Sequence, residues 1–195
     1  MNGVLEAFIT LFVIMNPLGS LPIFIGLTKG MPSIEIKKQV NNSVAVAGVL
    51  LFVFLFLGLW IFGFFGIDVN SFQIAGGIVL LILGILFVLG ESHRHVKHQG
   101  NDLSVPIGTP LLTGPGVITT TIIIVKENGT FIAVIAALLT LLATWLILVN
   151  SSRLYKALGM HWTNVISRVM GIILAAVAVK FITEGVLNVI APLIA

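Results

Sequence analysis

The sequence predicts an all-α polytopic membrane protein with six transmembrane helices. Apolar residues make up 58% of the chain and charged residues only 9%, whereas about 25% of the residues in a soluble domain are charged. Long stretches carry no Asp, Glu, Lys, Arg or His, and each exceeds the roughly 18 residues that cross a bilayer as a helix. Their hydrophobicity is continuous and does not alternate as in a barrel strand, so helices are expected.

Five stretches of the sequence are free of charge, and a sixth is apolar with a few charged residues. The five stretches are 7–28, 39–67, 69–90, 103–125 and 128–152. The sixth, at about 165–191, contains Arg168, Lys180 and Glu184. No basic segment precedes the first stretch, so we expect it to remain in the mature protein and not to be cleaved as a signal peptide. The sequence therefore predicts a single transmembrane domain over residues 1–195, embedded in the lipid bilayer.

Lysine and arginine residues gather in the odd-numbered loops. These residues are Lys29, Lys37 and Lys38 in the first loop, Arg94 and Lys97 in the third, and Arg153 and Lys156 in the fifth. The even-numbered loops and the termini contain only Lys126. Basic loops stay on the cytoplasmic side of a membrane, so we expect loops one, three and five in the cytoplasm and both termini outside the cell membrane. The net charge of +3 is then an orientation signal, and no nucleic-acid partner is expected.

The two halves of the sequence resemble each other. A proline in the first helix and a proline in the fourth are each followed by a glycine and three apolar residues. The two prolines lie about the same number of residues before their glycines. The landmarks are Pro17 and Gly77, and Pro115 and Gly171. We predict three-helix repeats at about 1–90 and 104–195, joined by a cytoplasmic linker at about 91–103. An odd number of helices inverts the second repeat, as in many secondary transporters; a chance similarity between Gly- and Pro-containing helices is the alternative.

Proline and glycine are dense within the first and the fourth predicted helices. Proline removes a hydrogen-bond donor from a helix, and irregular backbone at membrane depth is stable only where protein or a water-filled cavity satisfies it. A break also creates half-helix ends of opposite partial charge. We therefore predict discontinuous helices 1 and 4, with the substrate bound at their breaks. The candidate residues are Asn16, Pro17, Leu18, Gly19, Ser20, Thr113, Gly114, Pro115, Gly116 and Thr119.

A structural explanation of the same residues stays open. Glycine and proline are common in membrane helices in general, and threonine hydroxyls often bond to carbonyl groups of their own helix.

The motifs at the two breaks resemble those of the MarC/SnatA family of integral membrane proteins. Residues 16–22 read Asn-Pro-Leu-Gly-Ser-Leu-Pro, similar to the Asn-Pro-x-Gly-Asn signature, and residues 113–116 read Thr-Gly-Pro-Gly. The run Arg-Val-Met-Gly at 168–171 resembles the last helix of the family. The resemblance covers essentially the whole chain and implies transport of small neutral amino acids such as glycine and alanine, coupled to protons in some members. The chain departs from the family pattern at Ser20, where Asn is usual, and at Lys180, where Gln is expected.

Three charged residues within the last predicted helix are candidates for proton coupling or gating. Charges inside a membrane are costly and usually functional. Arg168 is placed near the cytoplasmic interface, whereas Lys180 and Glu184 lie one turn apart in the outer part of the helix. An interfacial position without a functional role is the alternative for all three. Since no carboxylate falls at the predicted midplane, a site of neutral groups and backbone dipoles suits a neutral or zwitterionic ligand.

Motifs of enzymes, metal sites and cofactor sites are absent from the sequence. It contains no His-Glu-x-x-His, Gly-x-Ser-x-Gly, Walker or dinucleotide motif, so we expect no enzyme and no cofactor. The chain has no cysteine. His93, His95 and His98 share one loop with Arg94 and Lys97, and these basic residues would repel a cation, so a solvated loop is preferred to a metal site.

These observations together predict a secondary active transporter that moves small neutral amino acids, glycine and alanine, across the cell membrane by alternating access. A proton is the expected coupling ion, on the family resemblance alone. Two other functions stay open: a channel or facilitator for a small neutral solute, and a membrane accessory protein that transports nothing. The sequence is equally compatible with a monomer and a homo-oligomer.

Overall fold

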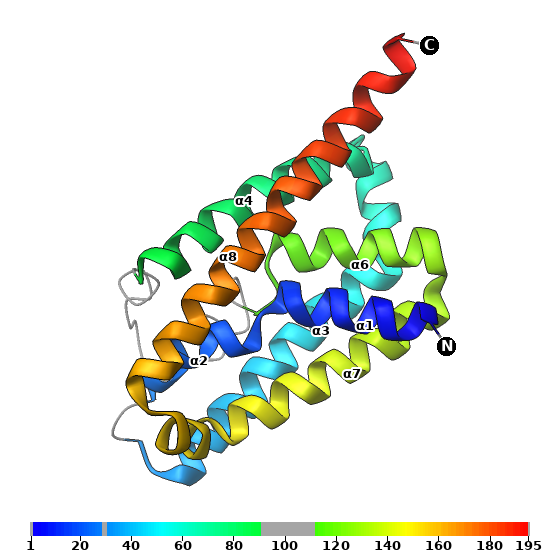
Figure 1. Ribbon diagram of the computed structural model, residues 1–195. Helices are drawn as coiled ribbons and strands as arrows, with labels where there is room; N and C mark the ends of the chain where they lie inside the picture. Colours follow the sequence, from blue (N-terminus) through cyan, green and yellow to red (C-terminus); the bar gives the residue numbers. More distant parts are fainter. Residues whose placement is uncertain (1, 29–30, 91–111, 195) are drawn as a thin grey trace.

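The protein is helical throughout the residues that the computed structural model describes, which are 2–28, 31–90 and 112–194 (Figure 1). Within this part the helices are α1 (Asn2–Met15), α2 (Pro17–Leu27), α3 (Ser33–Phe65), α4 (Val69–Leu89), α6 (Pro115–Asn128), α7 (Thr130–Val149) and α8 (Ser151–Ile194). Five described segments are long and apolar enough to cross a bilayer: Gly3–Leu27, Ser33–Phe65, Val69–Leu89, Thr130–Val149 and His161–Ala191. The prediction of an all-α protein with several membrane-spanning helices is thus confirmed for the described residues.

The first predicted helix is interrupted at Asn16, which separates α1 from α2. Asn16 adopts the left-handed conformation, with φ 49° and ψ 54°, and the next residue, Pro17, has no N–H to continue the hydrogen-bond ladder. The prediction of a discontinuous first helix is confirmed. In the second half, α6 begins at Pro115 and contains 14 residues, about 21 Å of helix, which is less than a bilayer's hydrocarbon thickness.

Two predictions for the region between α4 and α6 fall on residues outside the described part. They are the linker at about 91–103, with its three histidines, and the portion of the fourth helix before residue 112.

The turn between α3 and α4 is a compact pair of helix caps. α3 ends at Gly66, whose φ of 65° is the left-handed conformation that glycine adopts at helix ends. Asp68 caps α4 because its carboxylate accepts hydrogen bonds from the backbone N–H and the hydroxyl of Ser71. These hydrogen bonds hold the pKa of the fully exposed Asp68 carboxyl below its ordinary value.

The last helix begins earlier than the predicted start near residue 165. α8 starts at Ser151 and contains one non-helical residue, Gly159, with φ 74° and ψ 168°. The charged residues Arg153 and Lys156 precede this kink, so they lie on the helix and not in a loop. A continuous helix then runs from the kink past Arg168 and Lys180.

Glycines allow α4 and α8 to pack closely as an antiparallel pair. A Cβ added to Gly84 would lie 2.8 Å from the carbonyl oxygen of Gly171, and one added to Gly77 would lie 2.9 Å from that of Ala178. A Cβ on Gly185 would similarly lie 3.0 Å from the carbonyl oxygen of Asn70. Small residues at such crossings are typical of membrane helix pairs. Gly77 and Gly171, the landmarks of the two predicted repeats, thus both lie at this helix contact.

The remaining helices arrange themselves around this pair. α2 packs mainly against α8, and α6 packs against α4, while α7 contacts both α1 and α3. α3 and α7 are antiparallel, because Asn41 accepts a hydrogen bond from Trp145 and a Cβ on Gly48 would meet Leu141. In Figure 1, α2 and α6 extend in opposite directions from the middle of the molecule.

The described charged residues are divided between the two ends of the molecule. The end that holds the N-terminus and the α3–α4 turn (Figure 1) carries acids in excess: Glu6, Asp68, Glu127 and Glu184, with Lys126 and Lys180. The end that holds the α2–α3 and α7–α8 junctions carries bases in excess: Lys37, Lys38, Arg153, Lys156 and Arg168, with Glu35. We call these the acidic end and the basic end. Their separation matches the predicted grouping of loops on two sides.

Candidate functional site

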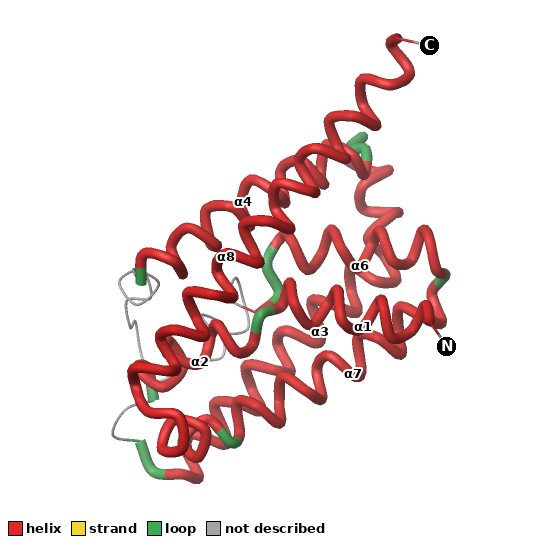
Figure 2. The backbone as a smooth tube through the Cα atoms, viewed as in Figure 1, coloured by secondary structure: helices red, strands yellow, loops and turns green. Residues whose placement is uncertain are grey.

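The break in the first helix and the start of α6 meet at a small cavity in the middle of the molecule. Its polar part consists of Asn16 from the first break and of Gly114 and Gly116 at the start of α6. Its apolar part comprises Ile14, Leu80, Leu83, Phe87, Val117 and Leu174. The cavity volume is about 20 Å³, which is enough for one water molecule. Figure 2 shows the irregular segments at residue 16 and at 112–114 side by side between the helices.

Asn16 organises the first break through its backbone and its side chain. Its N–H donates to the carbonyl of Phe12, and its own carbonyl accepts from the N–H of Ser20. Its side-chain oxygen Oδ1 accepts a hydrogen bond of 3.0 Å from the N–H of Gly19 and thereby caps α2. The other side-chain atom, Nδ2, is buried and has no hydrogen-bond partner among the described residues. Asn16 itself is only 3% exposed, so this unused donor points to an absent acceptor.

The start of α6 lacks the side-chain cap that α2 has. Gly114 is the N-cap residue and no side chain bonds to the first turn, so the N–H groups of Gly116 and Val117 have no partner within the helix. A Cβ added to Gly116 would lie 2.4 Å from Leu80 Cγ. Glycine at this position therefore lets α6 approach α4 next to the cavity.

The hydroxyl groups of the candidate residues are occupied by backbone carbonyls. Ser20 Oγ donates to Asn16, Thr119 Oγ1 to Pro115, and Thr113 Oγ1 to Ala47 in α3. The distances lie between 2.8 and 3.0 Å. Of these three bonds, only that of Thr113 reaches another segment of the chain, α3. In this conformation, therefore, the hydroxyls of these candidate residues bond to backbone carbonyls, as the structural alternative predicted.

The other candidates at the first break lie in the body of α2. Pro17 and Gly19 are buried, whereas Leu18 is half-buried and packs against the core. A Cβ added to Gly19 would lie 2.3 Å from Asn16 Nδ2, so glycine leaves room for the asparagine side chain. The carbonyl of Gly19 accepts a hydrogen bond of 3.1 Å from Ser167 Oγ in α8. This bond fixes α2 against α8 on the basic side of the cavity. Pro115, the first residue of α6, is half-buried.

A second, larger cavity is a polar cleft at the acidic end. It has a volume of about 590 Å³ and is formed by α1, α4, α6 and α8. The polar residues that line it are Glu6, Thr10, Asn70, Gln73, Thr120, Lys126, Glu127, Asn128, Lys180, Glu184 and Asn188. Thr120 lines this cleft, and its hydroxyl donates to the carbonyl of Gly116, which lines the small cavity, at 2.7 Å.

Glu184 is the centre of a short polar network on the wall of this cleft. Its Oε1 lies 3.6 Å from Lys180 Nζ, and its Oε2 accepts a hydrogen bond of 3.4 Å from Nε2 of Gln73 in α4. Gln73 is buried, whereas the side chains of Lys180 and Glu184 are 69% and 47% exposed. The predicted pair of Lys180 and Glu184 thus exists and is anchored to α4.

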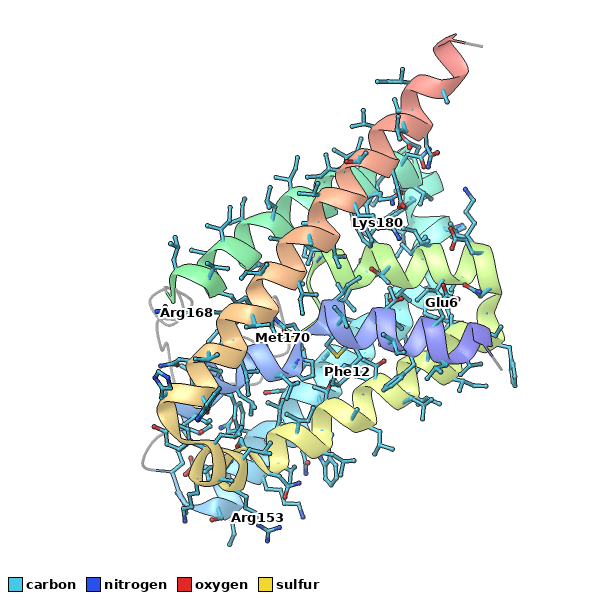
Figure 3. The ribbon with its side chains drawn as sticks, viewed as in Figure 1. Glu6, Phe12, Arg153, Arg168, Met170 and Lys180 are labelled. Atoms are coloured by element: carbon cyan, nitrogen blue, oxygen red, sulfur yellow. The ribbon has the colours of Figure 1, made fainter. Side chains whose placement is uncertain are left out.

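Arg168 does not join this pair. It lies three turns earlier on α8, at the basic end (Figure 3), where its guanidinium is next to Gly90 at the C-terminus of α4. A cation is favourable at a helix C-terminus. The arrangement agrees with the interfacial alternative for Arg168.

Sequence reasoning missed two polar residues that the structure brings into contact with candidate residues. Gln73 bonds to Glu184, and Ser167 bonds to Gly19. Each is a polar residue within a predicted membrane-spanning segment, and this signal was available, because polar side chains in a membrane helix require partners. The partners lie more than 100 residues away in the sequence, so no local motif marks them.

Comparison with known proteins places this architecture in a family. A family model described as "MarC family integral membrane protein" matches residues 1–190. The chain belongs to the MarC family. The resemblance recognised in the Asn-Pro and Thr-Gly-Pro-Gly motifs is confirmed over nearly the whole chain.

Relatives of comparable length share about a third of their residues with this chain. A UPF0056 membrane protein of Methanocaldococcus jannaschii is 34% identical, and the alignment covers 92% of this chain and 94% of the relative. The UPF0056 membrane protein YvbG of Bacillus subtilis is 35% identical, with 93% of each chain covered. The names of these relatives describe membrane proteins and assign no substrate. No solved structure matches the chain.

Proposed function

We propose that this MarC family protein is a secondary active transporter of small neutral amino acids, such as glycine and alanine. The observation that carries the proposal is the convergence of the break at Asn16 and the start of α6 on one cavity, with Asn16 on one side and Gly114 and Gly116 on the other. Discontinuous helices that meet inside a helical membrane protein form the substrate sites of many secondary transporters. The resemblance of the motifs to the amino acid transporters of the family adds the substrate class.

An inverted repeat is the architecture that best accounts for the helix contacts. α2 follows the first break and packs on α8, and α6 follows the second break and packs on α4. α4 and α8 are themselves antiparallel, as are α3 and α7. For these pairs, exchange of the two halves maps one helix contact onto another, which supports an inverted repeat. We propose two inverted three-helix repeats, in which alternating access arises when one repeat moves against the other around the cavity.

We propose that the polar cleft at the acidic end is the entrance to the cavity on that side. Its residue Thr120 is one helical turn from Gly116, and the two are hydrogen-bonded. On the basic side the bond between Ser167 and Gly19 holds α2 against α8. We place the basic end in the cytoplasm by the positive-inside rule, so this conformation faces outward from the cell membrane.

Glu184 is our candidate for proton coupling. It is the one carboxylate, among the described residues of the cleft, that is hydrogen-bonded to a buried side chain of another helix. Protonation would weaken its attraction to Lys180 and alter its bond to Gln73, and would thereby change how α4 and α8 interact at the entrance.

The test is uptake of radiolabelled glycine and alanine into proteoliposomes, with and without an imposed pH gradient. We expect saturable uptake that the pH gradient stimulates and that Asn16→Ala abolishes. Asn164→Ala is the matched control, because Asn164 is an exposed asparagine on α8 away from the cavity. Absence of uptake by folded wild-type protein would contradict the proposal. Uptake without saturation or counterflow would instead favour a channel.

A further inference from the structure

We infer that the small cavity is a carboxylate-binding site, in which the N-termini of α2 and α6 and the side-chain amide of Asn16 donate to the same anionic group. This inference rests on the proposed function, because it assigns to the same site the part of the substrate that the site recognises. It goes further in stating that a carboxylate is required and that a neutral amide or an amine alone is not accepted.

Two helix N-termini face the cavity from opposite sides. α2 has 11 residues and α6 has 14, and both begin with proline directly after the cavity-lining residues Asn16 and Gly114. The N-terminus of a helix carries a partial positive charge of about half an elementary charge. Two such ends at one point make the cavity electropositive, although the described residues that line it include no lysine, arginine or histidine.

Specific donors are available at both helix ends. In α2 the N–H groups of Gly19 and Ser20 donate to the side chain and the carbonyl of Asn16. The N–H of Leu18 is therefore the donor of the first turn that Asn16 does not bond. In α6 the N–H of Ile118 bonds to Gly114, and no side chain caps the first turn. The N–H groups of Gly116 and Val117 are therefore the donors that this end offers to a ligand. Uncapped N–H groups at a helix start are typical of anion sites.

The Asn16 amide is independent support for a ligand in the cavity. Its Nδ2 is buried without a partner among the described residues, although buried polar atoms are nearly always hydrogen-bonded. Because Oδ1 of the same amide is fixed by the N–H of Gly19, the orientation of the amide leaves a donor, and not an acceptor, for the cavity. A carboxylate oxygen satisfies this donor, whereas an ammonium group does not.

The rest of the site suits a small zwitterion. Pro17 has no N–H to donate to the carbonyl of Val13. The C-terminus of α1 therefore retains carbonyl oxygens close to the break, and an ammonium group would bind these oxygens. Six apolar side chains form the wall opposite the polar part of the cavity. The volume of about 20 Å³ means that the helices must move apart to admit even glycine.

The experiment measures ligand-induced thermal stabilisation of the purified protein in lipid nanodiscs, at constant ionic strength. The probes are sodium acetate, acetamide and methylammonium chloride, followed by glycine and glycinamide. We expect saturable stabilisation by acetate and glycine, competition between these two, and less than a tenth of the affinity for acetamide, methylammonium and glycinamide. Equal binding of acetate and acetamide, or a cavity that responds to no probe because it holds water only, would overturn the inference.

Asn16→Asp provides the residue-level test. The substitution preserves shape and leaves an oxygen to accept from Gly19, but it replaces the Nδ2 donor by a negatively charged oxygen. We expect at least a tenfold loss of acetate affinity, whereas Asn164→Asp, which adds the same charge to an exposed position, keeps it. Unchanged affinity in Asn16→Asp would contradict the inference. If that variant does not fold, the comparison of acetate with acetamide on the wild-type protein decides.

Binding and transport separate the two proposals. Selective acetate binding without amino acid uptake would refute the transporter proposal and leave the carboxylate site. Uptake of glycinamide as efficient as that of glycine would refute the carboxylate site and leave the transporter.

Discussion

Gly171 lies at the crossing of α4 and α8, where an added methyl group would meet backbone atoms of the facing helix. A Cβ at Gly171 would lie 2.8 Å from the carbonyl oxygen of Gly84 and 2.8 Å from Phe87 Cβ. Ordinary contacts of a Cβ begin at about 3.4 Å. The obstructing atoms belong to backbone or to Cβ, which no rotamer change can move. In Gly171→Ala the two helices must therefore separate by about 0.6 Å.

The expected change in stability of Gly171→Ala is the sum of two opposing effects. Overpacking of a close contact costs about 1–3 kcal/mol, while alanine in place of glycine within a helix gains about 0.5–1 kcal/mol. Gly63→Ala in α3 is the matched control, because a Cβ there meets nothing within 4 Å and only the gain applies. We expect Gly171→Ala to be less stable than Gly63→Ala by about 1–3 kcal/mol.

The assay is thermal unfolding of both variants and the wild type in the same detergent. For a chain of this length, about 2–4 °C of melting temperature corresponds to 1 kcal/mol, so we expect Gly171→Ala to melt several degrees below Gly63→Ala. Equal melting temperatures would show that the α4–α8 crossing can relax without cost, and would refute the tight seam that the structure shows. Gly84→Ala, which addresses the same crossing from α4, should behave like Gly171→Ala.

Further predictions concern single polar contacts. Ser167→Ala leaves the carbonyl of Gly19 without its donor, so unfolding measurements should show a loss of about 0.5–1.5 kcal/mol, and Ser167→Thr should recover part of it. Lys180→Met should change stability by less than about 1 kcal/mol, because the ion pair of Lys180 with Glu184 is exposed. A loss of pH-gradient stimulation of uptake at unchanged melting temperature would assign Lys180 a role in proton coupling. The Asp68 cap should stabilise α4 at neutral pH and lose this contribution as the pH falls through the lowered pKa of that carboxyl, so Asp68→Asn should flatten the acid side of the stability profile, and identical profiles would contradict the cap.

The break at Asn16 illustrates how much of the site was predictable. A proline after asparagine, within a charge-free stretch, interrupts the hydrogen-bond ladder whatever surrounds it. The sequence therefore indicated the discontinuity and the pairing of this motif with the glycines near Pro115. It did not indicate that the hydroxyls of Ser20 and Thr119 bond to their own helices while the Asn16 amide keeps a free donor. That difference depends on backbone geometry at single residues.

The sequence by itself determined that the protein is helical, that it belongs in a membrane and approximately where α3, α4 and α7 begin and end. These properties follow from apolar length, because the bilayer is a uniform apolar solvent and every buried backbone group must bond within its own helix. Only the tertiary structure decided that α8 pairs with α4 and that Gln73 anchors Glu184. In a membrane these pairings depend on close packing and on hydrogen bonds between distant residues, which hydrophobicity along the chain does not encode.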